Sequence, residues 1–260
     1  RFVLRALGLP ITNLLYVGGG NFYLLAAPHQ VGRLAQAQQH ISRALLQHHR
    51  GDLYLALAHV PLHGLDFFDG CISQAWQRLA EQLQSAKLHR FAELEPDDQA
   101  WLFIPQEDGG NEERQCQVCG VEHPGTSESE GVRKCPPCRS YEELGRDLRR
   151  ARFLLLEEVE PSAIDLAAAA GDYASALAAL GLRITVGDRR PPIPPGRATL
   201  LALDDASVDE LQPQPHLAVG RRFLVNTAPV LSEAGLADLR RDRYPEDPDD
   251  EPLRAGQVKP

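Results

Sequence analysis

Four of the five cysteines form two CxxC pairs, and their spacing limits what the middle of this chain can fold into. The pattern is C-x2-C-x15-C-x2-C, which lies within the range of spacings typical of zinc sites. Each CxxC turn can place two thiolates about 2.3 Å from one cation, and Gly120 offers the positive φ that such a turn needs. We therefore expect one structural zinc ion, enclosed by four ligands: Cys116, Cys119, Cys135 and Cys138.

Other uses of these cysteines were weighed against zinc. An iron–sulfur cluster also takes four cysteines and stays open as an alternative. Disulfides are disfavoured inside cells, and a redox motif needs one CxxC near a βαβ unit. His123 could replace a cysteine, although four sulfurs make it unnecessary. We interpret Cys71 as a buried small apolar residue, and residues 122–132 as a flexible finger that the metal holds at its base.

Composition bounds the class of protein. The 260 residues carry a net charge of −9, whereas a free-standing nucleic-acid binder is usually basic. One basic cluster, at residues 146–152, is interpreted as a solvated helix face; it consists of Arg146, Arg149, Arg150 and Arg152. No apolar run approaches the ~20 residues that a membrane span needs, and no secretory signal opens the chain. We expect a cytoplasmic protein with no membrane partner.

Both ends of the chain have the character of internal sequence. There is no methionine, and residues 1–7 have the pattern of the last turns of a helix. Residues 245–260 are acidic and rich in proline, as in a linker. We expect an interior segment of a longer protein.

The first 60 residues show the clearest secondary-structure pattern. Two short apolar runs, residues 13–17 and 22–26, flank the turn Gly18-Gly19-Gly20-Asn21, which is typical of a β-hairpin. A helix is expected from Pro28 to Gly51, because apolar residues recur there every three or four positions. A strand is expected at residues 52–60. This order predicts a ferredoxin-like palm unit that lacks its first strand and most of its first helix.

The rest of the chain predicts further helices, at residues 71–94, 141–159 and 172–180, and strands at 183–186, 199–203 and 223–225. A linker with four prolines lies at residues 189–196. The expected fold class is α+β. It comprises a partial palm domain (1–66), a helical zinc-binding region (67–160), a small α/β domain (161–244) and a linker to a missing second palm (245–260).

The hairpin turn carries the remaining hint of chemistry. Palm-type nucleotidyl transferases and cyclases place carboxylates in this turn, where they hold divalent metals against substrate phosphates. The turn here reads GGGN and contains no carboxylate. Its backbone N–H groups can approach a nucleotide, but we expect no catalytic residue in it. The alternative interpretation, which stays open, is that the glycines serve the turn alone.

Several runs in order resemble a known family. They are LLYVGGGNFYLLAAP (14–28), DLYLALAHV (52–60), AKLHRFAEL (86–94), the two CxxC pairs and YEELGRDLRRARFLLL (141–156). Together they are similar to the first palm of the large subunit of type III CRISPR effector complexes, Csm type. The resemblance covers most of residues 1–160 and fits the remainder more loosely.

This resemblance implies a role in antiviral defence. Subunits of the family carry a His-Asp nuclease domain that cuts single-stranded DNA. Their second palm, with a GGDD turn and two metal ions, joins ATP into cyclic oligoadenylates once target RNA is bound. The matching turn would help to hold one of two ATP molecules through Gly18, Gly19, Gly20, Asn21 and Phe22. The four cysteines match the family's zinc site.

The implied partners are ATP, the other subunits of the complex and, through them, CRISPR RNA and target RNA. ATP with Mg²⁺ or Mn²⁺ is expected only in the full-length protein, so this segment alone should show neither activity.

Two readings outside this family remain to be compared with the structure. One is a zinc-ribbon module that binds RNA without catalysis, since the strands offer possible stacking aromatics in Tyr16, Phe22, Tyr23 and Tyr54. The other is a self-sufficient diguanylate or adenylate cyclase, against which the missing acids argue.

Overall fold

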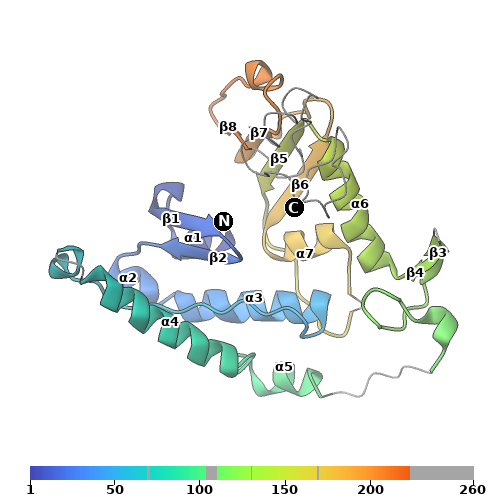
Figure 1. Ribbon diagram of the computed structural model, residues 1–260, viewed down its shortest axis with the longest axis horizontal. Coiled ribbons are helices and arrows are strands. Elements are labelled where there is room, and N and C mark those ends of the chain that lie inside the picture. Colours follow the sequence, from blue (N-terminus) through green and yellow to red (C-terminus); the bar gives the residue numbers. More distant parts are fainter. Residues whose placement is uncertain (69–70, 104–109, 130, 169, 223–260) are drawn as a thin grey trace, which may run out of the picture.

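The computed structural model describes residues 1–222 except 69–70, 104–109, 130 and 169. Figure 1 shows helix α3 (Leu34–His49) between a four-stranded sheet on one side and helix α4 (Ile72–Leu88) on the other. The mixed α and β composition of the predicted fold class is confirmed. Among the described helices, none has the length and apolar character that a membrane crossing requires.

The predicted hairpin is present. Strands β1 (Leu14–Gly18) and β2 (Asn21–Leu24) pair antiparallel, with Gly18 opposite Asn21. The two turn residues, Gly19 and Gly20, have φ of 57° and 74°. Glycine adopts this left-handed backbone without a steric cost, which is why a two-residue turn of this kind favours it.

The helix predicted from Pro28 to Gly51 is two helices, α2 (Pro28–Val31) and α3. The break falls at Gly32. Glycine destabilises a helix because it loses more backbone conformational entropy than other residues when it becomes helical. Helix α1 (Phe2–Leu7) ends at Gly8 and packs on α3 through Val3, Leu7 and Ile41. Phe22 and Leu24 of β2 contact the same core.

The strand predicted at residues 52–60 is wrong: this segment is extended but pairs with no described strand. In a ferredoxin-like sheet the last strand pairs with the first strand and not with the hairpin, and the described residues include no strand in that place. The side-chain amide of Gln38 instead donates to Leu55 O (2.8 Å) and accepts from Leu57 N–H (2.7 Å). The complete palm sheet therefore stays a prediction.

Helix α4 ends six residues before the predicted boundary at residue 94. Phe91 takes φ of 63° in the turn that follows, and an unpredicted helix, α5 (Pro96–Trp101), begins with proline at its first position. Phe91 and Leu94 pack with Leu46 of α3 in a second core. The 3₁₀ turns are Ile11–Asn13, Gly64–Phe67, Glu112–Arg114 and Val208–Glu210.

The helix predicted at residues 141–159 is wrong at both ends. Helix α6 (Pro136–Arg150) begins five residues earlier, and β5 (Phe153–Glu158) follows it as a strand. Phe153 and Leu155 are fully buried at alternate positions, the two-residue period of a strand. Strand β5 pairs with a neighbouring strand on each edge. Phe153 and Leu155 therefore pack in the hydrophobic core of the sheet.

The sheet has the strand order β6-β5-β7-β8. Strand β5 is antiparallel to β6 (Leu182–Gly187) and β7 (Ala198–Ala202), and β7 is parallel to β8 (Leu217–Arg221). Strands β6 and β7 and helix α7 (Tyr173–Ala179) confirm their predictions, while β8 was missed.

The predicted strand at 223–225 and linker at 245–260 lie outside the described residues. Because β5 falls within the range predicted for the helical region, that region also supplies a strand of the sheet; the domain boundaries themselves stay predictions.

A polar network joins α3 to the turn after α4. Ser42 is fully buried and donates to the Glu93 carboxylate, which also accepts from Gln38 Nε2 (3.1 Å) and from Tyr54 OH (3.3 Å). Burial raises the pKa of Tyr54 to about 12, and the nearby Glu93 charge and hydrogen bond add to the effect. The neutral phenol is therefore the form that this network stabilises.

This network predicts a pH dependence at alkaline pH. The folded-state pKa of Tyr54 is raised, so its contribution is complete below pH 10 and is lost as pH rises toward about 12. We expect the difference in unfolding free energy between wild type and Tyr54→Phe to change between pH 9 and pH 11.5 in urea titrations. A difference that is constant over this range would contradict the assignment.

Candidate metal centre

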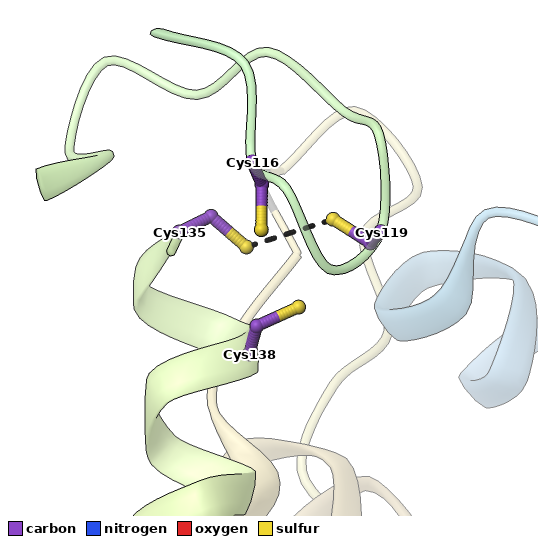
Figure 2. Close-up of side chains that lie close together, drawn as sticks. All are labelled: Cys116, Cys119, Cys135 and Cys138. Atoms are coloured by element: carbon purple, nitrogen blue, oxygen red, sulfur yellow. Dashed lines mark hydrogen bonds between the residues drawn. The ribbon is translucent and has the colours of Figure 1, made fainter. Parts of the chain in front are cut away.

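The two CxxC pairs meet at one point. Their four Sγ atoms lie within 4.8 Å of one another, and Cys119 Sγ is 3.8 Å from Cys135 Sγ. Figure 2 shows the sulfurs converging, two from a loop and two from the start of α6. In a regular tetrahedron with bonds of about 2.3 Å, neighbouring sulfurs would be about 3.8 Å apart. The arrangement therefore has the dimensions of a single four-coordinate ion.

The first CxxC turn is closed by backbone hydrogen bonds. Cys116 N–H donates to Val121 O (3.0 Å), and Gly120 N–H donates to Cys116 O (2.9 Å). Gly120 has φ of 75°, as expected from its place after Cys119. These bonds fix the backbone of the loop that carries the first two sulfurs.

The second CxxC pair is built into the first turn of α6. Cys135 is the extended residue before the helix, and Pro136 occupies the first helical position, where its fixed φ suits helix initiation. Cys138 lies three residues after Cys135 and so points to the same side. The Pro136-Pro137 dipeptide was the signal for this helix start, which the sequence reasoning missed.

The connection between the pairs is more regular than the expected flexible finger. It contains a short antiparallel hairpin of β3 (Ser127–Ser129) and β4 (Val132–Lys134). Gln117 N–H donates to Arg133 O (2.9 Å), and Arg133 N–H donates to Gln117 Oε1 (2.7 Å). The hairpin is thereby fixed to the first CxxC turn.

The electrostatics of the cluster favour a bound cation. Burial acts to raise the pKa of the Cys116 thiol, but backbone N–H groups of Cys119, Cys135 and Val118 lower it to about 6. Burial raises the pKa of Cys135 and of Cys138, and neighbouring thiols add to the effect at Cys138. Several thiolates this close repel one another, so a divalent cation that replaces their protons stabilises the cluster.

The geometry also separates the alternatives. Sulfurs within 4.8 Å leave room for one ion, whereas an iron–sulfur cluster places iron and sulfide atoms between its cysteines. His123 lies outside the ligand set, because its Nδ1 accepts from Gly125 N–H (2.9 Å). Cys71, at the start of α4, is half-buried and not fully buried as expected. The residues present fit zinc; the identity of the ion stays a prediction.

Aromatic contacts place the metal centre against α3. The Tyr141 hydroxyl lies 3.4 Å from His49 Nε2, and the Tyr141 ring is near the Tyr173 ring, with centroids 6.4 Å apart. Ser140 Oγ accepts from Tyr173 N–H (3.1 Å). Ser140 and Tyr141 were not singled out from the sequence, although they follow Cys138 within one helical turn.

The basic cluster at residues 146–152 is engaged in ion pairs. Arg146 pairs with Glu142 (3.6 Å), and Arg152 pairs with Asp204 (3.3 Å) and Glu210 (2.9 Å). These partners are partly exposed. Arg146, Arg149 and Arg150 lie on α6, but Arg152 follows the end of the helix, so the predicted helix face includes only three of the four arginines.

The hairpin turn is about a hundred residues before the cysteine cluster in the sequence and contains none of its ligands. Gly19 and Gly20 are exposed at its tip, and Asn21 Nδ2 donates to Gly19 O (3.0 Å). Gly18 lies under the Tyr16 hydroxyl, while the Phe22 side chain packs into the core beside α1 and α3. The five predicted nucleotide-binding residues are therefore contiguous, but only the first four present atoms at the turn; their role stays a prediction.

The cysteine cluster predicts a stoichiometric metal. We expect one zinc per chain by atomic emission, and we expect Cys116→Ser to bind far less. Each lost kcal/mol lowers the Tm by about 2–4 °C in a chain of this size, so the variant should melt at least about 5 °C lower. Cys71→Ser is the matched control and should keep both values. Full zinc retention by Cys116→Ser would refute the four-ligand assignment.

Comparison with known proteins identifies relatives. Residues 1–106 match the family model described as Csm1 subunit domain B. Two curated relatives are named CRISPR system single-strand-specific deoxyribonuclease Cas10/Csm1 (subtype III-A). The protein from Thermococcus onnurineus is 31% identical over 160 residues, and that from Methanocaldococcus jannaschii is 27% identical over 160 residues. These matches cover 56% and 54% of this chain, but only 19% of each relative.

A solved structure has a similar fold. It is a Csm1–Csm4 cassette in complex with one ATP, with a TM-score of 0.50 and 20% sequence identity, and the match covers 84% of this chain and 24% of that chain. The family model and the curated relatives confirm the resemblance to Csm-type large subunits. Residues 1–106 match the model of the Csm1 domain B family, and the chain is similar to the Cas10/Csm1 large subunits of type III-A CRISPR systems.

Proposed function

We propose that this chain is the structural and ATP-facing part of a cyclic oligoadenylate synthase within a type III CRISPR effector complex. It contributes the GGGN turn to nucleotide binding and no catalytic group. The observation that carries the proposal is the exposed pair of glycines at the end of β1 and β2, in a chain related to Cas10/Csm1.

The turn suits the approach of a phosphate. Gly19 and Gly20 both have positive φ, and a Cβ on either would meet no described atom within 4 Å. Successive backbone N–H groups in such a conformation form a concave site for anions. Nothing in the described residues covers this backbone, so a nucleotide can reach it from outside.

The same turn lacks the means to activate a hydroxyl. Residues 18–22 include no carboxylate, so they offer no charged ligand for Mg²⁺ or Mn²⁺. Two-metal catalysis needs such ligands on one side of the nucleotide. In our proposal the catalytic carboxylates belong to another part of the full-length protein, and the present turn positions the ATP.

The relatives support the proposed setting. One similar structure is a Csm1–Csm4 cassette in complex with one ATP, and the curated relatives are named as single-strand-specific deoxyribonucleases. We assign to the parent protein a comparable place: contact with a Csm4-like subunit, ATP as substrate, and CRISPR RNA and target RNA reached through the complex. Cleavage of single-stranded DNA would lie outside this chain.

The metal centre has a structural role in this proposal. Four thiolates close the coordination shell of zinc, which leaves no open position for substrate. Cys116 and Cys135 are buried, as is typical of a site that fastens elements together. The ion would hold the loop at residues 116–119 against the start of α6.

The RNA-binding reading loses its main support. Among its four candidate aromatics, Phe22 packs in a core and Tyr54 is bonded to Glu93. Tyr23 packs edge-on against Trp76, with ring centroids 4.5 Å apart. Tyr16 remains exposed, and an RNA-recognition sheet needs two or three stacking aromatics.

The turn can be tested by a pair of glycine variants in the full-length subunit. Gly19→Val should reduce cyclic oligoadenylate synthesis about tenfold or more, since the loss of one phosphate contact is worth about 1.4 kcal/mol. Gly131→Val is the matched control, because Gly131 also has positive φ (77°) and open space around it, but lies in the β3–β4 hairpin. Product is measured by chromatography in assembled complexes.

Unchanged synthesis by Gly19→Val, with assembly intact, would refute the turn assignment. An equal loss in both variants would show that backbone strain, and not nucleotide contact, is responsible.

The missing carboxylates predict inactivity of the chain alone. Purified chain with ATP and Mg²⁺ should form no cyclic or linear oligoadenylate above a blank without protein, because the turn at residues 18–22 contains no carboxylate to hold the metal ions. The measurement is the same chromatographic assay. Product that depends on the chain would contradict the proposed division of labour.

A further inference from the structure

Helix α7 is a seven-residue helix whose C-terminal end is held by side chains from α1 and α3. Arg5 of α1 donates through Nη1 to Gly181 O (3.0 Å) and Val159 O (3.1 Å), and through Nη2 to Leu180 O (3.3 Å). His40 of α3 lies 2.7 Å from Ala179 O, so its Nε2 is the donor. The last carbonyls of a helix lack partners within it, and cations are favoured there.

The fit around Arg5 is close. Gly181 has φ of 66°, and a Cβ built on it would lie 1.7 Å from Arg5 Nη2 and 2.8 Å from Val159 O. Only glycine leaves room for the guanidinium at this position. The contact of Arg5 with the end of α7 is therefore specified by backbone shape as well as by hydrogen bonds.

The N-terminal end of α7 is held by the helix that carries the metal ligands. Tyr173 N–H donates to Ser140 Oγ (3.1 Å), and the Tyr173 ring lies against Tyr141. Ser140 comes two residues after Cys138 in the first turns of α6. Gly171, two residues before Tyr173, donates its N–H to His48 Nδ1 (3.3 Å).

We propose that α7 links metal binding at the four cysteines to the Arg5 contact. This inference rests on the proposed metal site. A bound ion fixes the start of α6 and with it Ser140, which orders the start of α7. A helix of seven residues is about 10 Å long, so ordering its start also helps to position Ala179 O for His40 and Leu180 O for Arg5 at its other end.

The linkage is reciprocal by thermodynamic necessity. If the metal strengthens the Arg5 contact, the Arg5 contact strengthens metal binding by the same factor. A residue about 110 positions from the first cysteine should therefore affect how tightly the chain holds zinc. No contact between Arg5 and a cysteine is involved.

The experiment measures the equilibrium partition of zinc between the purified chain and a coloured chelator, and the rate of zinc release to an excess of that chelator. Arg5→Met should weaken the equilibrium affinity for zinc roughly five- to tenfold, a coupling of ordinary size, and should release zinc faster than wild type. Arg183→Met is the matched control, since it removes an exposed arginine from the adjacent strand β6, where Arg183 pairs with Glu157 (3.8 Å). Its release rate should equal that of wild type.

A second variant traces the route. Ser140→Ala removes the acceptor for Tyr173 N–H, so Arg5→Met added to Ser140→Ala should cause no further acceleration. If Arg5→Met does not fold, His40→Phe serves in its place. That variant keeps a ring against Phe2, whose centroid lies 4.8 Å from that of His40, and removes the donor. It should also speed release.

The outcomes are distinguishable. A wild-type chain that binds no zinc overturns the metal proposal and the linkage together. A chain that binds one zinc but releases it at the same rate in Arg5→Met and His40→Phe overturns the linkage alone. Acceleration that persists undiminished in the Ser140→Ala background also overturns it, because the route through α7 would not be used.

Discussion

Helix α3 contributes side chains to two of the three hydrophobic cores found among the described residues. Ile41 packs with α1 and the hairpin, while Leu46, which has no exposed surface, packs with Phe91, Leu94 and Leu166. The polar side chains of the same helix bond to the flanking main chain: Gln38 to residues 55 and 57, and Gln47 to Asp165 N–H (3.2 Å). The hairpin, the segment after α3 and the loop before α7 thus depend on one helix for their positions.

Local chemistry made some parts of this structure predictable. A CxxC pair brings its own two sulfurs together through a few backbone bonds, so its spacing alone indicates a metal ligand pair. The GGGN turn likewise needs glycine at φ values that other residues avoid, and the hairpin follows from the flanking apolar runs. In both places the signal and the structure lie within the same few residues.

Predictions failed where the outcome depends on distant partners. Residues 52–60 have the composition of a strand, but a strand also needs a neighbour to bond with, and Gln38 supplies those bonds in its place. Residues 153–158 continue the apolar spacing of α6, yet they pair on both edges with β6 and β7. Strand β8 was missed because its run LAVGR is short and is recognised only by its pairing with β7.

Helix α4 buries little of its surface for its length. Of its seventeen residues, only Ala75 is buried, and Trp76 keeps 43% of its surface exposed. An element with so few buried apolar contacts opens at a free energy well below that of global unfolding. In the free chain α4 is therefore expected to form its own cooperative unit, and its persistence in an assembly would depend on surface that another molecule supplies.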